Sequence, residues 1–177
     1  MIDIIIINPN NNLPQTLASL LLQKKIKLGT IYIWSNDGKI NEIVYLFSKK
    51  MKICLKKALN IDETTILIKY SKFKEKGDYV FVIRSGDVIY NSFSLYTLYK
   101  ELNNNNFDIA NGNIIKGTKS AYFYKTNKQA GIFGRLYNNK FINKLSENNT
   151  FYKVNELILS KNPKALFLND DIYVYYV

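Results

Sequence analysis

The first half of the chain alternates short apolar runs with amphipathic segments. Four runs are apolar and rich in β-branched residues, as expected for strands inside a parallel sheet: 3–7, 30–34, 52–55 and 79–83. Between and after them, apolar residues recur at spacings of three and four, which predicts helices, the last at 93–102. Strands alternating with helices predict a doubly wound α/β sheet with right-handed crossovers over residues 1–102.

The pattern changes after residue 106. Segments 107–110, 113–115 and 121–124 have the composition of strands, separated by Gly-Asn and Gly-Thr turns. The pattern predicts helices at 133–145 and 152–159 and a terminal strand at 172–177. There is no internal repeat and no Pro/Gly-rich linker, so we expect one domain with two halves, 1–102 and 103–177.

Polar loops follow three of the predicted strands, at 8–12, 35–38 and 84–87. In sheets of this class, ligands bind outside the carboxyl ends of the strands. These three loops therefore predict a binding site at the carboxyl ends of the strands.

The composition excludes several kinds of catalytic and metal-binding site. The chain has no histidine, which excludes a histidine base, a histidine metal ligand and a Ser-His or Cys-His pair. The single cysteine, Cys54, lies in an apolar run, which favours a buried structural thiol over a nucleophile. The apolar run at 4–7 is much too short for a transmembrane segment, so we expect a cytoplasmic protein of a cell or virus.

The net charge is +11, from 25 Lys+Arg against 14 Asp+Glu. The lysines are scattered and no nucleic-acid-binding motif accompanies them. This pattern favours a solvated basic surface, and nucleic acid is an unlikely partner.

Several motifs, in matching order over nearly the whole chain, resemble the GT-A glycosyltransferases of the large family-2 type. Residues 77–87, a strand with a polar tip, are similar to the segment "gdyi-flDsDD" of that family. The other matches are the opening "iiiPtyN" at 5–10, "l-SllnQ" at 17–23, "iivvDDGS" at 31–38, the "N-G" position at Asn60, "gklyrr" at 134–137 and "ED" at 155–156.

The resemblance implies a GT-A (Rossmann-like), mostly parallel sheet with helices on both faces and a small acceptor-side α+β extension. Residues 1–102 would be the nucleotide-side half and 103–177 the acceptor-side half. It also implies a nucleotide-sugar donor. By motif position, the nucleotide-binding residues would be Asn8, Asn10, Asn36, Asp37, Asn60, Arg84 and Asp87.

The chain departs from the family pattern where that pattern carries its chemistry. Family aspartates that hold a metal fall on Arg84 and Gly86, which leaves only Asp87. One carboxylate is a poor site for Mg²⁺ or Mn²⁺, so either metal is doubtful and no cofactor is certain. The position of the family's base falls on Asn155, and the nearest carboxylate is the adjacent Glu156.

Two interpretations follow. In the first, Arg84 replaces the metal by gripping the diphosphate with two parallel hydrogen bonds, and Glu156 is the catalytic base. In the second, the protein is a catalytically inactive relative with a structural or interaction role. One example of such a role is a component of a viral particle, located in the host cytoplasm or the virion. Its partners would then be other proteins or further copies of the same chain. Arg84 would then pair with Asp87, and Glu156 would be a solvated helix residue.

Two further features have simple structural explanations. The Asp37-Gly38 pair is compatible with an ordinary turn. The tyrosines near the carboxyl terminus, Tyr173, Tyr175 and Tyr176, are typical of side-chain packing in a terminal strand.

Overall fold

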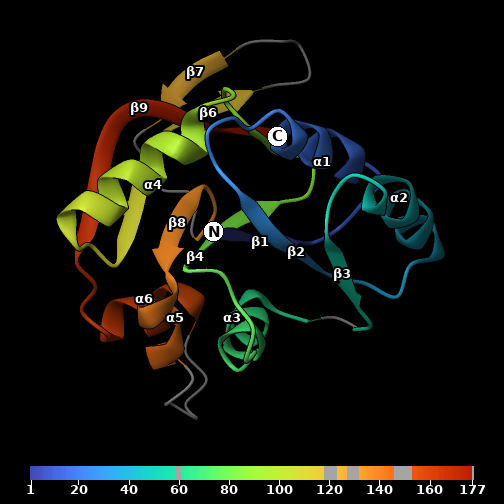
Figure 1. Ribbon diagram of the computed structural model, residues 1–177, viewed down its shortest axis with the longest axis horizontal. Coiled ribbons are helices and arrows are strands. Elements are labelled where there is room, and N and C mark those ends of the chain that lie inside the picture. Colours follow the sequence, from blue (N-terminus) through green and yellow to red (C-terminus); the bar gives the residue numbers. More distant parts are fainter. Residues whose placement is uncertain (59–60, 118–122, 127–131, 146–152, 177) are drawn as a thin grey trace.

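The computed structural model describes residues 1–58, 61–117, 123–126, 132–145 and 153–176. In these residues the chain forms a mixed sheet with helices on both faces (Figure 1). The strands are β1 (Ile2–Ile7), β2 (Leu28–Trp34), β3 (Ile53–Lys56), β4 (Tyr79–Arg84), β5 (Val88–Ile89), β6 (Ile109–Gly117), β7 (Phe123–Thr126), β8 (Arg135–Asn138) and β9 (Ala165–Tyr176). The helices are α1 (Leu13–Leu21), α2 (Gly38–Ser48), α3 (Glu63–Ser71), α4 (Ser94–Asn105), α5 (Asn139–Leu145) and α6 (Val154–Ser160).

The strand order is β3-β2-β1-β4-β8-β6-β9-β5, with β7 paired to β6. The first four strands of this order are mutually parallel, as predicted. The carboxyl ends of β1, β2 and β4 therefore meet at one edge of the sheet. Beyond β4 the ladders are mixed, because β8 is antiparallel to both β4 and β6 while β6 and β9 are parallel.

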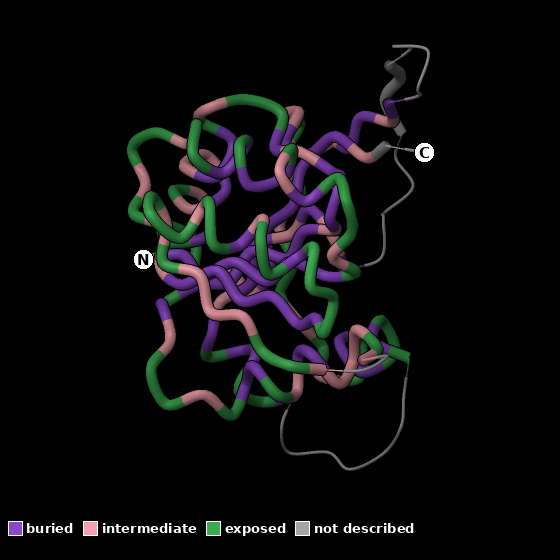
Figure 2. The backbone as a smooth tube through the Cα atoms, turned by 90° about the vertical axis from the view of Figure 1, so that its right-hand side faces the viewer, coloured by how far each residue is buried: buried purple, intermediate pink, exposed green. Residues whose placement is uncertain are grey.

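Each face of the sheet supports its own hydrophobic cluster. Along β4, Phe81 and Ile83 belong to the first cluster and Val80 and Val82 to the second, as the alternation of side chains along a strand requires. Helices α1, α2 and α4 cover the first cluster, and α3, α5 and α6 cover the second. Figure 2 shows the strands as a buried layer inside a more exposed shell.

Two predictions for the second half are wrong. The segment 133–145 is not one helix, because it contains strand β8 before helix α5. Leu136 packs in the first cluster and its neighbour Tyr137 in the second, which is the period of a strand. The segments 107–110 and 113–115 are also not separate strands, because Asn111–Asn113 continue β6 through an irregular register with β9.

Cys54 is only half-buried, and it packs against the second cluster. Within the described parts of the chain, no helix combines the length and the apolar composition of a membrane span.

Candidate functional site

A pocket of about 300 Å³ opens at the carboxyl ends of β1 and β2. Its wall combines polar residues from the loops after these strands with apolar residues from β2, the β3–α3 connection and α3. The lining residues are Asn8, Pro9, Trp34, Ser35, Asn36, Asp37, Ala58, Ile61 and Ile66. Three of the predicted nucleotide-binding residues, Asn8, Asn36 and Asp37, are thus brought together.

The Asp37 carboxylate is held in place by the start of α2. Its Oδ1 accepts a hydrogen bond of 2.8 Å from the backbone N of Lys39, and its own N donates to Ser35 Oγ at 3.0 Å. Asp37 is the N-cap of the helix, so the Asp37-Gly38 pair starts a helix instead of forming an isolated turn. The cap fixes an exposed carboxylate in the lining of the pocket.

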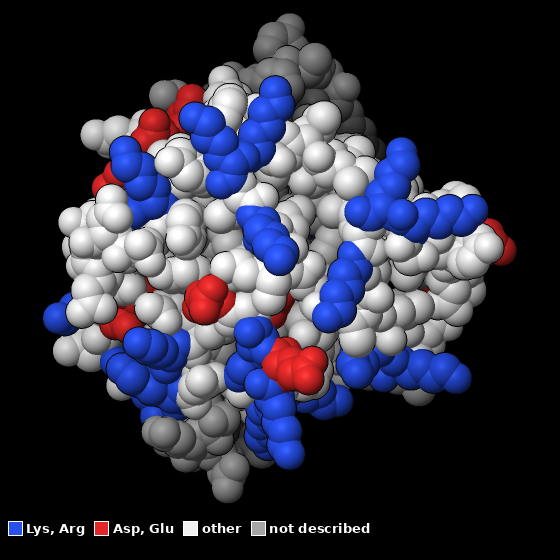
Figure 3. Space-filling view, in the orientation of Figure 1, with Lys and Arg blue, Asp and Glu red and all other residues white. Residues whose placement is uncertain are grey.

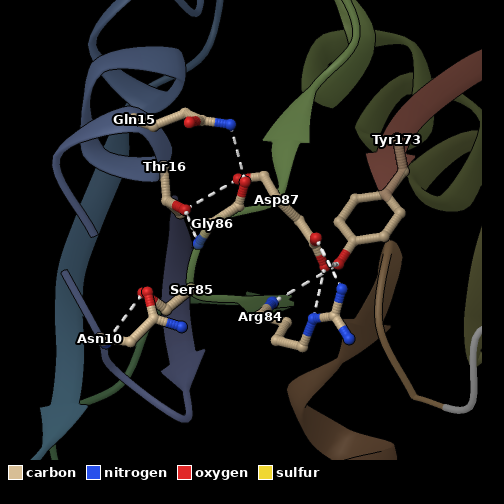
Figure 4. A network of polar contacts seen from close by, with 8 residues as sticks. All are labelled: Asn10, Gln15, Thr16, Arg84, Ser85, Gly86, Asp87 and Tyr173. Atoms are coloured by element: carbon tan, nitrogen blue, oxygen red, sulfur yellow. Dashed lines mark hydrogen bonds and ion pairs between the residues drawn. The ribbon is translucent and has the colours of Figure 1, made fainter. Parts of the chain in front are cut away.

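The polar tip that follows β4 is tied to the first turns of α1 (Figure 4). Thr16 Oγ1 accepts from Gly86 N at 2.9 Å and donates to the Asp87 carbonyl at 2.8 Å. Gln15 Nε2 donates to the Gly86 carbonyl at 2.8 Å. Gly86 has φ +93°, a conformation that residues with a side chain rarely adopt. These contacts make the tip a rigid turn.

Asn10 supports the tip from the loop after β1. Its backbone N donates to Ser85 Oγ at 3.2 Å, and its side-chain Oδ1 accepts from Asn12 N at 2.8 Å. Asn10 is not among the residues that line the pocket. Its contacts therefore position the strand tip, and the nucleotide contact predicted for it stays a prediction.

Arg84 and Asp87 form a bidentate ion pair at the polar tip after β4. Arg84 Nε and Nη2 donate to the two oxygens of the Asp87 carboxylate at 3.1 and 3.0 Å. Tyr173, from β9, donates its hydroxyl to Asp87 Oδ2, and the Arg84 guanidinium lies 4.4 Å from the centre of the Tyr175 ring. Figure 4 shows Arg84 and Tyr173 converging on the one carboxylate. The ion pair considered for Arg84 from the sequence is therefore present.

Burial and charge shift the pKa values of this cluster in a consistent way. Burial raises the pKa of the Tyr173 hydroxyl well above its ordinary value, and the negative charge of Asp87 raises it further. Burial acts against the charge of Arg84, but its hydrogen bonds to Asp87 and the charge of that carboxylate together raise the pKa of the guanidinium above its ordinary value. Arg84 is thus a permanent cation, and 29% of its side chain is exposed.

Glu63, at the start of α3, lies within electrostatic range of Arg84. Burial raises the pKa of its carboxyl group, the charge of Asp62 raises it further, and the charge of Arg84 lowers it in part. Glu63 is half-buried and stands between Ile61 and Ile66, both of which line the pocket. The first turn of α3 therefore connects the pocket with the Arg84 cluster.

The residues at the tip do not fit a divalent metal. Asp87 is 1% exposed, and both of its oxygens accept hydrogen bonds from Arg84 or Tyr173. Among the described residues, no group of three or more acidic or cysteine side chains is placed to hold a metal ion. The cation that contacts the Asp87 carboxylate is the Arg84 guanidinium.

Two residues predicted from motif positions are Glu156, the candidate base, and Asn60, a candidate nucleotide ligand. Glu156 is exposed on α6, and its Oε2 accepts a hydrogen bond of 3.3 Å from Lys153 N, so it caps its own helix. Asn155 is also exposed. Asn60 lies outside the described residues. A catalytic role for Glu156 and a nucleotide contact for Asn60 stay predictions.

Sequence reasoning missed several residues of this region. Trp34 is the last residue of β2, directly before a polar loop, so the rule that located the loop also indicated this residue. Thr16 carried no such signal, and the pattern around Tyr173 predicted only packing in a terminal strand. The two residues contact Gly86 and Asp87 from 70 and 86 residues away in sequence.

The fold is that of the GT-A glycosyltransferases, which confirms the predicted fold class. The chain is similar to TarS 1-349 of S. aureus, solved in complex with UDP-GlcNAc, with a TM-score of 0.71 and 13% identity, covering 99% of this chain and 58% of that one. It is also similar to the mannosyltransferase PcManGT from Pyrobaculum calidifontis, solved in complex with GDP-Man and Mn²⁺. That TM-score is 0.73 at 10% identity, covering 98% of this chain and 56% of that one.

The chain thus spans a little over half the length of these two structures. No protein-family model matches the sequence, and no curated protein matches it.

Proposed function

We propose that this chain is a glycosyltransferase of the family-2 type that binds its nucleotide-sugar donor without a divalent metal. The nucleoside occupies the pocket between Asn8 and Ile66, and the diphosphate lies against the Arg84 guanidinium. The observation that carries the proposal is the position of Arg84, a permanent, partly exposed cation at the carboxyl end of β4. Asp87 and Tyr173 hold this cation in place.

The pocket has the character of a nucleoside site. Its volume of about 300 Å³ is within the range of small-molecule pockets, roughly 300–1,000 Å³. Trp34, Ile61 and Ile66 offer apolar surface for a flat base, while Asn36 and Asp37 offer hydrogen-bonding groups. In the proposed complex, the Asp37 carboxylate accepts a hydrogen bond from an N–H group of the base.

The use of arginine supports an anionic ligand. The chain has 23 lysines and only two arginines, Arg84 and Arg135. Arg135, the first residue of β8, pairs with Val82 of β4. Val82 is two residues before Arg84, so both arginines lie near the carboxyl end of β4. The planar guanidinium binds phosphate with two parallel hydrogen bonds, which a lysine ammonium cannot do. A fixed cation here also stabilises the diphosphate leaving group.

Calorimetric titration of UDP, UDP-GlcNAc and GDP-mannose, in EDTA and in Mn²⁺, tests the proposal. We expect the same affinity in both conditions. Arg84→Lys should weaken the binding of nucleoside diphosphates by about tenfold or more, because it removes a charge-assisted hydrogen bond. The affinity for uridine or guanosine, which lack a phosphate, should not change. Lys72→Ala, at an exposed lysine beyond α3, is the control. Affinity that depends on Mn²⁺, or no binding at millimolar nucleotide, would contradict the proposal.

A non-catalytic role is the second candidate, and one observation favours it. The carboxylate nearest the expected base position, Glu156, caps its own helix, and the position itself is Asn155. A protein that binds the donor but neither hydrolyses nor transfers its sugar would be a binding module or scaffold. Donor hydrolysis by the wild type, and its loss in Glu156→Gln with donor affinity unchanged, would instead support catalysis. Light scattering after size exclusion tests the homo-oligomer expected of a scaffold.

A further inference from the structure

Exposed apolar side chains and lysines gather where the end of α1 meets the start of α4. Leu22 is 67% exposed, Tyr90 49% and Phe93 42%. Exposed apolar side chains that lie together are more informative than single ones. They lie in the same two segments as two exposed lysines and a half-buried tyrosine. We call this set the basic-aromatic patch: Leu22, Lys24, Lys25, Tyr90, Phe93 and Tyr96.

Hydrogen bonds join the two segments of the patch into one surface, although about 70 residues separate them in sequence. Lys24 N donates to the Ser92 carbonyl at 2.7 Å. Gln23 Nε2 donates to the Asn91 carbonyl at 2.9 Å, and Leu95 N donates to Gln23 Oε1 at 3.2 Å. These hydrogen bonds fix the two segments of the patch relative to each other.

The lysines of the patch lie over its aromatic rings. The Nζ atoms of Lys24 and Lys25 are 5.9 and 5.7 Å from the centre of the Phe93 ring, and Lys25 Nζ is 5.8 Å from that of Tyr96. These distances are within the reach of a cation–π contact, about 6 Å. The positive charge and the apolar surface thus occupy the same place.

No acidic residue belongs to either segment. The sequence has no Asp or Glu between Asp3 and Asp37, and none between Asp87 and Glu101. Figure 3 shows basic side chains over much of one face of the molecule, including its upper part, with fewer acidic side chains among them. Within these two segments, all the formal charge is therefore positive.

We propose that this patch docks the protein on an anionic lipid bilayer. Lysine ammonium groups attract anionic headgroups, while tyrosine, phenylalanine and leucine side chains enter the boundary between headgroups and acyl chains. A single-stranded nucleic acid would instead need open ring faces on which bases stack. Here lysines lie over the rings of Phe93 and Tyr96, and the exposed Leu22 offers nothing to a base.

This docking is independent of the proposed function. The patch and the pocket share no residue, so docking at the patch uses none of the side chains that line the pocket.

Co-sedimentation of the whole chain with vesicles tests the proposal. Vesicles of phosphatidylcholine alone should bind little protein, and vesicles with roughly a third of phosphatidylglycerol should bind it well at low salt. Binding should weaken steeply in about 0.5 M NaCl, where the screening length is only a few ångströms. Lys24→Glu/Lys25→Glu should weaken binding at least tenfold, since each lysine near an anionic surface contributes several-fold in affinity.

Matched variants distinguish the contribution of the patch to vesicle binding from that of the net charge. Lys72→Glu/Lys74→Glu makes the same change in net charge at exposed positions elsewhere and should bind nearly as well as the wild type. Phe93→Ser keeps every charge and should also weaken binding, because it removes apolar contact. Melting temperatures of all variants check that they fold. Equal losses in the two lysine variants, no loss in Phe93→Ser, no binding to anionic vesicles, or tighter binding to single-stranded DNA would each overturn the proposal.

Discussion

Two buried aspartates at opposite ends of the parallel strands have different partners. Asp3, near the start of β1, and Asp87, beyond the end of β4, are each 1% exposed. A buried carboxylate is costly unless it is paired or accepts several hydrogen bonds. The two residues meet this requirement with different partners, and the partners indicate what each residue does.

Asp3 is satisfied by neutral donors. It accepts hydrogen bonds from Thr30 N at 2.9 Å, Gly77 N at 2.8 Å and the Tyr70 hydroxyl at 2.9 Å. Asn139 Nδ2 in turn donates to the Tyr70 hydroxyl at 2.8 Å. This network joins β1, β2, α3, α5 and the segment before β4, so its role is structural.

Asp87 is satisfied by the Arg84 cation and the Tyr173 hydroxyl. Its partner is partly exposed at the edge where ligands bind in sheets of this kind. Asp87 therefore holds a charged group at the carboxyl end of β4, where we propose that the diphosphate of the donor binds. Burial and residue type are the same at both positions, and the difference lies in the partners: neutral hydrogen-bond donors for Asp3 and a cation for Asp87.

The largest effect is expected from Asp3→Ala. The change leaves buried donors from three parts of the chain without their acceptor, and each unsatisfied donor costs about 1–3 kcal/mol. We expect the free energy of unfolding, measured by urea denaturation, to fall by about 3 kcal/mol or more. A loss below about 1 kcal/mol would show that water or another group replaces the carboxylate.

The next effect concerns the ion pair at the other edge. Asp87→Asn leaves the Arg84 cation without its counter-charge and should destabilise the fold by about 2 kcal/mol, because Arg84 is partly solvated. Adding Arg84→Gln should recover part of this loss, with a coupling of about 1–3 kcal/mol in a double-mutant cycle. Simple additivity of the two changes would contradict a direct pairing in solution.

Tyr173→Phe should cost about 1–2 kcal/mol of stability, because it removes one hydrogen bond from a buried carboxylate. The exposed Tyr90→Phe is the matched control and should cost almost nothing. Thermal unfolding of both variants measures the difference. An equal effect in both would mean that the Tyr173 hydroxyl is dispensable for the tip.

The smallest effect depends on pH. Burial raises the pKa of Glu63 above its ordinary value of 4.5, so folding favours the protonated form. The stability contributed by this group is present below the ordinary pKa and is lost as pH rises through the raised one. Glu63→Gln should therefore raise the melting temperature near pH 7 by about 1–3 °C and change it less near pH 4. Glu75→Gln, at an exposed position, should show no such difference.

Much of the structure of residues 1–102 could be predicted from local patterns. The apolar runs that predicted strands at 3–7, 30–34 and 79–83 match β1, β2 and β4, because buried parallel strands are apolar on both faces. The loops after them contribute Asn8, Asn36 and Asp37 to the pocket. The second half was harder, because the short strand β8 and helix α5 are adjacent in a segment whose apolar positions fit both periods.

The sequence by itself determined the parallel half of the sheet, the polar edge of that sheet, and the absence of two carboxylates from the tip after β4. Only the tertiary structure decided that Arg84 pairs with Asp87 and that Tyr173 of β9 completes the pair from 86 residues away. It also brought Lys24 and Lys25 over Phe93. The physical reason is that side-chain periodicity specifies which face of a strand or helix is buried, whereas the order of strands in the sheet specifies which distant side chains meet.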